Sequence, residues 1–595
     1  MVLKRHTAAF LISIVVGGIY VSHHFFIPRV IDSLREAYYP VTLQAYFDEA
    51  SFYGHRAHAA YLGQWNLGDI HTAEYEGGPA LMPLLSPVVL GFLGRISGSM
   101  ARGFIISDFI FPAAIFFLIY AICYELTSRR TGSLLASSLF LFIPTIGVSL
   151  PPVSWTHINE MMRAFFPFGF GESTLFFSNF EDPKITFLFF TFALWVLVRA
   201  LKEKTPRRAI FGGIGFGLLF YVYLYAWATF VVTLALLFIL LLCLKDNDRA
   251  VIVLKVLLIG FGVSIPYWIN LAGLYQLPQG HEIAARAGRE ISHALRVATV
   301  WKSYVRIAVL MPLLAFFVLK DDGARRWKII LVSAFLLSYA VVVNVQVVTG
   351  FNIHPDHWYR VQFLPVMLAV FLLLAAAYDG LARGRMRMIG KWTAFAFLVY
   401  FLAGQAYYQY ALSSDAAYAK NFVVPRARME AYQWLSEHTS KGSVVAAFSF
   451  ETNRELPLHT HNKIYVPHGL LTIAPDEEIW DRFFFVNRLF GVLPDEFRKR
   501  IKEGSVAYYL FEERYTSQEF DSAFRESERR FPQSLIDEKT RQYEAHVESK
   551  DVTPRYQLDY VYTDERDGGY GMILDDVVWL EKVYDNGTIK IYKSR

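Results

Sequence analysis

The segment AYFDEASFYGHRAH, residues 45–58, combines two adjacent carboxylates with an arginine and two histidines. A well-placed carboxylate can take a proton from a reacting group, and a guanidinium can pair with a phosphate through two parallel hydrogen bonds. In a helix over this segment, Asp48 and His55 share one face, and Glu49 and Arg56 share the neighbouring face. The two carboxylates then point about 100° apart, so one can face a cavity while the other pairs or caps.

A plainer explanation for Asp48 and Glu49 is a helix N-terminus, where acidic side chains offset the helix dipole. The position of the pair favours a functional role, because it follows closely on the first long apolar run of the chain. Ionisable groups held at membrane level are costly and are commonly functional.

The elements that must position this segment are membrane helices. The chain has 595 residues, of which 54% are hydrophobic and 19% are charged, and its apolar runs are long enough to cross ~30 Å of hydrocarbon. We therefore predict a polytopic α-helical membrane domain over residues 1–412, with about eleven transmembrane helices, followed by a soluble α/β domain over residues 413–595. The predicted spans are 7–28, 104–124, 132–150, 183–200, 209–225, 227–244, 250–271, 304–319, 329–348, 360–378 and 391–411.

Lysines and arginines orient these spans. The short loops 128–130, 202–208, 245–249, 320–328 and 383–391 are basic and, with Lys4 and Arg5, fall on one side. By the positive-inside rule this side is cytoplasmic, which places the N-terminus inside and the C-terminal domain outside. The apolar stretch 80–96 contains two prolines, and we interpret it as an interfacial helix. The predicted outer loops are 29–103, 151–182, 272–303 and 349–359.

Several classes of function find no support in the sequence. A net charge of +5 without a dense basic stripe does not indicate a nucleic-acid partner. The two cysteines, Cys123 and Cys243, lie in apolar runs and predict no disulfide. A P-loop, a G-x-G-x-x-G after a strand, an HExxH and a CxxC pair are all missing, so neither a nucleotide cofactor nor a metal is signalled.

The layout resembles the GT-C superfamily of integral membrane glycosyltransferases, in the style of the protein O-mannosyltransferase and aminoarabinose transferase group. The resemblance starts with the acidic pair Asp48-Glu49 in the first outer loop. Two features of other members are missing: the WWD tripeptide of oligosaccharyltransferases, and a D-x-D in the second outer loop, which would suggest a bound divalent metal. The other similar stretches are LGRISG (93–98), SRRTGSLLA (128–136), HPDHWYRVQFLPVMLAVFLLLAA (354–376), RMEAYQWLSEHTSKGSVVAAFS (428–449) and EKVYDNGTIKIYKS (581–594).

The resemblance implies a sugar donor carried on polyprenyl phosphate at the outer leaflet, and a glycan, lipid or protein acceptor. It implies that Asp48, next to Glu49, is the general base of an inverting transfer to an acceptor hydroxyl. Positive charge must then hold the leaving phosphate, and Arg360 is the first choice for this. The other candidate substrate-binding residues are Arg56, Glu160, Arg163, Glu172, Arg286, Arg289, His354 and His357.

Alternatives remain open. Arg360 can also serve as an interfacial anchor beside Trp358 and Tyr359. The whole chain can also be a non-catalytic transporter or flippase, or a glycan polymerase or ligase acting on lipid-linked saccharides. Transporters commonly contain internal repeats, and no clear repeat is present.

The C-terminal part alternates helix and strand patterns. Asn586-Gly587 supplies a tight turn that predicts a hairpin over 582–592. These patterns predict a small α/β domain. The predicted helices are 426–439, 476–491 and 517–532, and the predicted strands are 443–450, 505–513 and 558–565.

Overall fold

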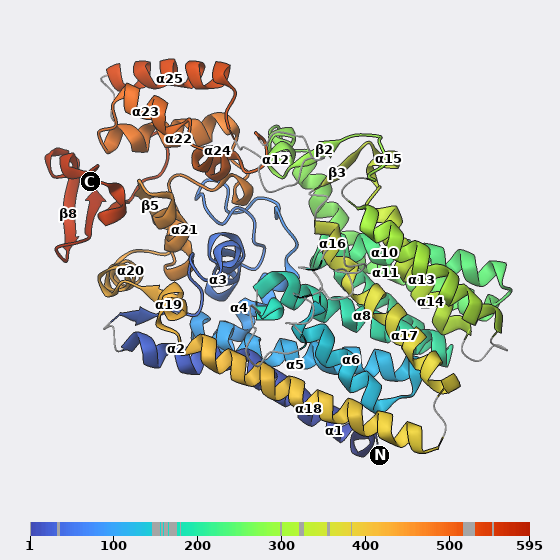
Figure 1. Cartoon of the computed structure of the whole chain (residues 1–595). Helices are drawn as coiled ribbons and strands as arrows, with labels where there is room; N and C mark the ends of the chain where they lie inside the picture. The colour runs from blue at the N-terminus through green and yellow to red at the C-terminus, as the bar shows by residue number, and fades with distance from the viewer. Residues whose placement is uncertain are drawn as a thin grey trace. The chain divides into compact units, whose positions relative to one another are not determined.

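The contacts of the computed structural model divide the chain into two units (Figure 1). Unit 1 contains Met1–Val30, Phe104–Tyr267 and Ile291–Ala419, and unit 2 contains Ile31–Gly103, Trp268–Glu290 and Lys420–Arg595. Each unit therefore gathers segments that are far apart in the sequence. The structure describes residues 2–32, 36–144, 155, 159, 165, 175–178, 180–297, 300–320, 326–353, 357–381, 384–515, 530–549 and 553–595.

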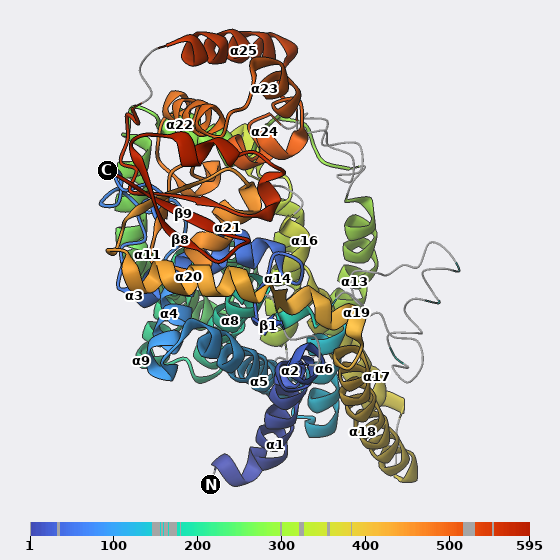
Figure 2. The same cartoon turned by 90° about the vertical axis from the view of Figure 1, so that its left-hand side faces the viewer.

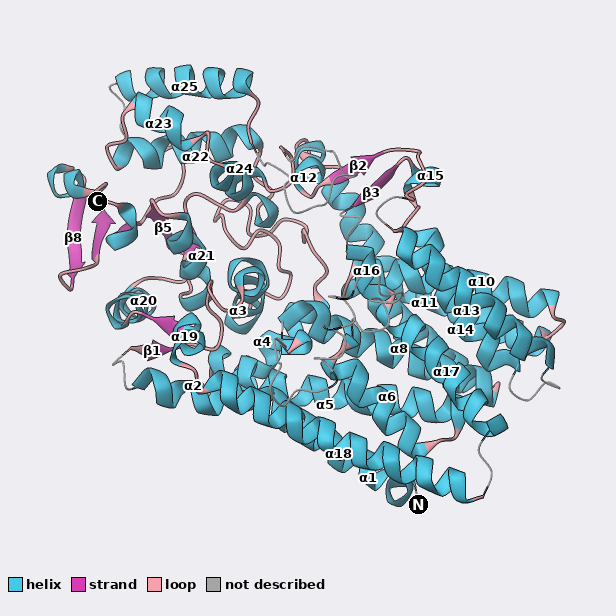
Figure 3. Cartoon of the chain, in the orientation of Figure 1, coloured by secondary structure: helices cyan, strands magenta, loops and turns pink. Residues whose placement is uncertain are grey.

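Unit 1 is built mainly of helices (Figure 3). Seven helices in the described part of the chain are long and apolar enough to cross a membrane, which agrees with a polytopic membrane fold. These candidate spans are His6–Asp32, Met100–Thr127, Pro183–Glu203, Leu224–Cys243, Asn247–Tyr275, Trp358–Asp379 and Arg385–Ser413. They correspond to α1 (Val2–Val21) with α2 (His23–Asp32), α5 (Met100–Thr127), α8 (Thr186–Glu203), α10 (Leu224–Cys243), α11 (Asn247–Tyr275), α16 (Trp358–Val361) with α17 (Phe363–Leu381), and α18 (Arg385–Ser413).

The other four predicted spans also coincide with helices. Two of them have only 13 residues, fewer than the ~20 that cross a bilayer unaided, so the number eleven stays a prediction. The four helices are α6 (Arg130–Phe142), α9 (Pro206–Leu218), α13 (Trp301–Lys320) and α14 (Arg326–Val342).

Small residues bring α9 and α11 close together. A Cβ added to Gly213 would lie 2.5 Å from Cβ of Ile259, and one added to Gly217 would lie 2.5 Å from Cβ of Val263. Both distances are shorter than van der Waals contact, so these positions accept only glycine without rearrangement. Helix α9 also packs against α8.

Unit 2 is built around a five-stranded mixed sheet with the order β6-β5-β7-β9-β8. The central strand β5 pairs in parallel with β6 and β7, and β9 pairs antiparallel with β7 and β8. Figure 2 shows the predicted hairpin as β8 and β9 side by side. The strands are β5 (Val444–Ala447), β6 (Lys463–Ile464), β7 (Tyr560–Thr563), β8 (Leu580–Asp585) and β9 (Lys590–Ser594); a separate antiparallel pair is formed by β1 (Ala37–Tyr38) and β4 (Val423–Val424).

One predicted strand is wrong. The sequence predicts a β-strand over residues 505–513, but Gly504–Phe511 form helix α24. Val506, Tyr509 and Phe511 are all buried in one apolar cluster. A short, fully buried apolar run shows no periodicity that separates strand from helix, and the surrounding core decided.

Two of the remaining helices of unit 2, α20 (Arg426–His438) and α22 (Asp476–Leu489), are predicted by the sequence. The stretch 80–96, expected to form an interfacial helix, contains most of the short apolar helix α4 (Leu85–Ser97). Most of the predicted helix 517–532 lies outside the described residues. The helices of unit 2 are α3 (Gly54–Leu62), α4 (Leu85–Ser97), α12 (Gly280–Arg286), α20 (Arg426–His438), α21 (Phe450–His459), α22 (Asp476–Leu489), α23 (Pro494–Arg500), α24 and α25 (Gln533–Glu548).

A buried carboxylate ties the first loop to the C-terminal segment within unit 2. Asp69 accepts hydrogen bonds from the backbone N–H groups of His71 and Thr72 through Oδ1, at 2.9 and 2.8 Å. Its Oδ2 accepts the Thr472 hydroxyl at 2.6 Å and the Ile473 N–H at 2.9 Å. Residues 31–103 and 420–595 therefore fold together as one body.

Candidate functional site

The two carboxylates of the first loop lie in different environments. Asp48 is exposed, whereas Glu49 is only 3% exposed. Glu49 opens a π-helical turn, Glu49–Tyr53, in which the Gly54 N–H donates to the Glu49 carbonyl. This turn contains one residue more than an α-turn. The face that we expected Asp48 to share with His55 is therefore broken, and His55 is buried.

Gly54 makes the π-turn possible. A Cβ at this position would lie 2.6 Å from the Glu49 carbonyl oxygen and 2.7 Å from Cδ1 of Leu458. Only a residue without a side chain fits there. Helix α3 starts at Gly54 and carries Arg56, whose buried guanidinium donates to the carbonyl of Pro83.

Three buried histidines of unit 2 are linked to one another, two through their rings and the third through its backbone N–H. His55 Nδ1 lies 3.1 Å from His71 Nε2, and His55 Nε2 contacts the carbonyl of Arg454. His71 Nδ1 accepts the backbone N–H of His468 at 3.2 Å, and His468 Nε2 lies 3.3 Å from Glu512. His55 and His71 lie 16 residues apart in the first loop, whereas their partners Arg454 and His468 come from the C-terminal segment, about 400 positions away.

Burial keeps these histidines neutral. It lowers the pKa of His55 to about 3 and that of His58 to about 4, and it lowers the pKa values of His71 and His468 well below their usual range. Neutral imidazoles that bond to one another hold the loop in place, and they are poor acid–base groups near neutral pH.

A polar cavity of about 260 Å³ lies beside His55 in unit 2. Polar and charged side chains from the first loop and from the C-terminal segment line this cavity, namely His55, Gln64, Glu76, Lys441, His461 and Lys463. Lys463 is buried, its Nζ lies 3.4 Å from the Asp69 carbonyl, and burial lowers its pKa. The cavity is a small polar hollow built by both segments of the unit.

Arg286, one of the candidate phosphate holders, is completely buried in unit 2. Its Nη2 donates to the Ala474 carbonyl at 2.9 Å, and its Nε lies 3.7 Å from Asp476. Burial lowers the pKa of this guanidinium to about 10. The backbone of Arg289 belongs to β2 (Arg289–Ile291).

Two candidates lie close together in unit 1. His357 Nδ1 lies 2.8 Å from the Tyr223 hydroxyl, and Arg360 lies three residues later in α16. The Arg360 guanidinium lies 5.8 Å from the centre of the Tyr359 ring, and its Nε contacts the Tyr359 hydroxyl at 3.3 Å. Four other candidates, Glu160, Arg163, Glu172 and His354, lie outside the described residues.

Unit 1 also contains a buried charged cluster that our sequence analysis missed. Asp108 in α5 accepts from Lys184 and lies 2.8 Å from Nε2 of His24. Lys184 also donates to the Ser107 hydroxyl at 2.8 Å, and His23 stacks on His24. An aspartate within the apolar run 104–124 was the available signal, since intramembrane charges are rare.

This cluster contains a group of possible metal ligands, His23, His24 and Asp108. The donor set suits a cation such as zinc. The Lys184 ammonium, however, already lies against the Asp108 carboxylate and supplies its counter-charge. The arrangement is therefore a self-compensated ion pair with histidine partners.

Comparison with known proteins adds distant neighbours. No family model matches the chain, and no curated protein matches it in sequence. Among solved structures, ArnT from Cupriavidus metallidurans bound to undecaprenyl phosphate is 11% identical with a TM-score of 0.44, covering 100% of this chain and 98% of that one. The apo state of the same protein is 10% identical with a TM-score of 0.44, covering 99% and 96%.

The Archaeoglobus fulgidus oligosaccharyltransferase in complex with zinc and sulfate is 11% identical, with a TM-score of 0.39, and covers 92% of this chain and 69% of that one. At these identities and TM-scores the likeness does not by itself assign an activity to this chain.

Proposed function

We propose that the chain is an inverting membrane glycosyltransferase that moves a sugar from a polyprenyl-phosphate donor to an acceptor hydroxyl, with Asp48 as general base. The observation that carries this proposal is the division of the acidic pair. Asp48 reaches solvent at the start of the π-turn, while Glu49 is buried behind it. An accessible carboxylate on a fixed turn suits proton abstraction from an acceptor near a lipid surface, and the described part of the chain contains seven helices able to cross a membrane.

The proposed reaction is a single displacement. Asp48 takes the proton of the acceptor hydroxyl. At the same time the acceptor oxygen attacks the anomeric carbon from the face opposite the phosphate. The bond between that carbon and the phosphate oxygen breaks, and polyprenyl phosphate leaves with the electron pair. Phosphate is a good leaving group, so positive charge rather than a general acid is needed on that side.

The other candidates take different roles. Glu49 and Arg56 are buried next to the π-turn, so we assign them to positioning Asp48. Arg360 is half-buried in the short helix α16 and stays the first choice for the phosphate. Arg286 is enclosed by its own unit and is a weaker choice.

The proposal places the reaction at the extracytoplasmic face of the membrane, the side on which the topology prediction puts the first loop. Acceptors there include glycans, lipids and proteins. In this proposal the carboxylate and the cationic side chains of the chain itself provide the proton acceptor and the counter-charge.

The test uses the purified full-length protein in detergent, with polyprenyl-phosphate sugars extracted from cells that make the protein. Asp48→Asn should lower transfer by a factor of about 10² to 10⁴, with unchanged elution and thermal unfolding. The matched control is Asp495→Asn, which removes another exposed carboxylate of unit 2 and should keep full activity. Transfer at the normal rate by Asp48→Asn would refute the assignment of the base.

A further inference from the structure

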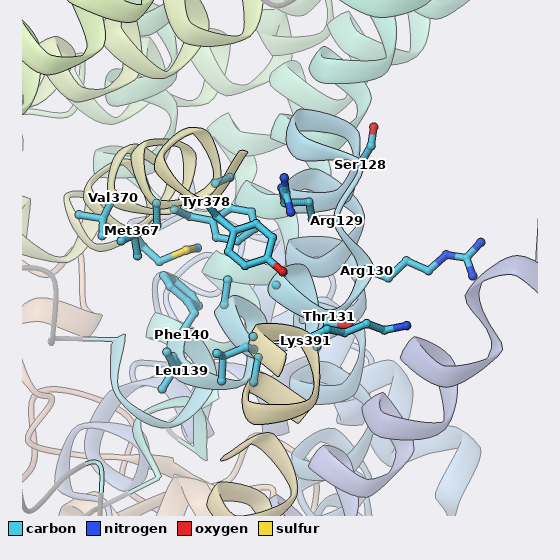
Figure 4. Close-up of a pocket in the computed structure, with 18 of the residues that line it drawn as sticks. Ser128, Arg129, Arg130, Thr131, Leu139, Phe140, Met367, Val370, Tyr378 and Lys391 are labelled. Atoms are coloured by element: carbon cyan, nitrogen blue, oxygen red, sulfur yellow. The ribbon is translucent and has the colours of Figure 1, made fainter. Parts of the chain in front are cut away.

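A large cavity lies within unit 1, apart from the residues proposed for transfer. Its volume is about 860 Å³, within the range of ligand-binding sites. Its walls come from α6, α17 and α18, and Ser128 and Arg129, which directly precede α6, also line it. Figure 4 shows side chains from these elements around the cavity.

The lining changes character along the cavity. Leu139, Phe140, Met367 and Val370 lie together at one end, and the Tyr378 ring lies between them and the basic residues (Figure 4). Ser128, Arg129, Arg130, Thr131 and Lys391 lie at the other end (Figure 4). Arg387 also lines the cavity. The cavity therefore has an apolar interior and a cationic mouth.

One of the mouth arginines already has partners. Arg129 forms an ion pair with Asp379, and its guanidinium lies 4.6 Å from the centre of the Tyr378 ring. Arg130 and Lys391 are exposed, and among the described residues neither has a salt-bridge partner. Their charge remains available to an anion at the mouth.

The start of α6 adds to this preference for an anion. Its N-cap, Arg129, makes no side-chain capping bond, and Thr131 and Gly132 of the first turn line the cavity. Uncapped N–H groups at a helix start favour negative charge. Together with Arg130 and Lys391 they form a mouth suited to a phosphate.

The depth of the cavity matches one leaflet of a bilayer. Phe140 follows Arg130 by ten residues along α6, which is about 15 Å at the helical rise. Half of the ~30 Å hydrocarbon core is also about 15 Å. A chain that enters at the basic mouth and ends near Phe140 therefore spans one leaflet.

We propose that this cavity binds an anionic diacyl phospholipid, with one acyl chain in the apolar interior and the phosphate at Arg130, Lys391 and the first turn of α6. Arg130 and Lys391 belong to two of the basic stretches of the sequence, 128–130 and 383–391, whose charge predicts the cytoplasmic side. The leaflet on that side commonly carries the anionic lipids that attract juxtamembrane lysines and arginines. The site is therefore separate from the proposed donor site, which is predicted on the opposite side.

Native mass spectrometry of the detergent-purified protein tests this, with dioleoyl-phosphatidylglycerol and dioleoyl-phosphatidylcholine titrated separately. The protein should bind one phosphatidylglycerol about tenfold more tightly than one phosphatidylcholine. Arg130→Gln combined with Lys391→Gln should remove this preference. Arg207→Gln combined with Lys245→Gln removes the same charge from two other loops on the same predicted side and should leave it intact.

A second variant tests the apolar interior. Ala394 lines the cavity, and Ala394→Phe should shorten it and weaken the binding of both lipids. Equal binding of the two headgroups by the unmodified protein would overturn the proposal, as would equal losses in the two double variants. Displacement of the bound phosphatidylglycerol by equimolar undecaprenyl phosphate would identify a prenyl site instead and would also overturn it.

Discussion

His71 donates a hydrogen bond from Nε2 to Nδ1 of His55 across 3.1 Å. The direction follows because His71 Nδ1 accepts the backbone N–H of His468, so the neutral ring carries its proton on Nε2. His55 then carries its proton on Nε2, which faces the Arg454 carbonyl. A second proton on either ring would place two N–H groups against each other.

The histidine chain predicts a loss of stability in acid. Burial lowers the pKa of His55 to about 3 and that of His58 to about 4, whereas unfolded histidine titrates near 6.5. Below pH 6.5 the unfolded chain binds protons that the folded chain excludes, so the free energy of unfolding falls as the pH falls. We expect about 1.4 kcal/mol per histidine per pH unit between pH 6.5 and 4.

Thermal unfolding of the purified protein between pH 4.5 and 8 measures this slope. His55→Gln should make the acid side of the curve shallower. His438→Gln changes an exposed histidine of α20 and should not alter the slope. A melting temperature that stays constant below pH 6.5 would contradict the neutral histidine chain.

Asp69 predicts that the first loop depends on the C-terminal segment for its folding. Asp69→Asn replaces an acceptor oxygen with an NH₂ group, which then faces either backbone N–H groups or the Thr472 hydroxyl and the Ile473 N–H. We expect a loss of about 2–3 kcal/mol in the free energy of unfolding. Limited proteolysis should show faster cleavage within 63–80, while Asp576→Asn, at an exposed site, should be cleaved like the unmodified protein.

The buried pair Asp108 and Lys184 predicts strong coupling. Asp108→Asn or Lys184→Met alone leaves a buried charge without its partner and should cost about 3–5 kcal/mol. The double variant should cost clearly less than the sum of the two single losses. The exposed pair Lys204 and Asp248, 3.0 Å apart, is the comparison and should contribute less than about 1 kcal/mol. Additive losses at Asp108 and Lys184 in denaturation experiments would show that the two groups do not act as a pair.

The close approach of α9 and α11 in unit 1 predicts that Gly213 and Gly262 differ in their tolerance of a larger side chain. Gly213→Leu should lower the melting temperature and the yield of folded protein, because the new side chain would meet Ile259 at once; overpacking of this kind costs about 1–3 kcal/mol or more. Gly262 lies in α11 with no neighbouring atom within 4 Å of an added Cβ. Gly262→Leu should therefore insert and melt normally, and similar melting for both variants would contradict the close approach of α9 and α11.

Much of the helical layout could be read from the sequence, because burial in lipid demands long apolar helices whatever their neighbours. Within the described residues every predicted span overlaps a helix, and seven helices there are long and apolar enough to cross a membrane. The hairpin at Asn586-Gly587 is confirmed for a similar reason, since its turn is a local preference. The strand expected at 505–513 failed because a uniformly apolar run takes its conformation from the core around it.

In the candidate site, too, some features follow from the local sequence and others from the packing of distant segments. Residue types and spacing pointed to the acidic pair Asp48-Glu49 and to the helix that carries it, since these depend on neighbours in the chain. Which carboxylate reaches solvent, and how the His55 and His71 rings are held, depended on a π-turn at Gly54 and on residues 454–473. Burial and long-range hydrogen bonds arise only when distant segments pack together, so only the tertiary structure decided them.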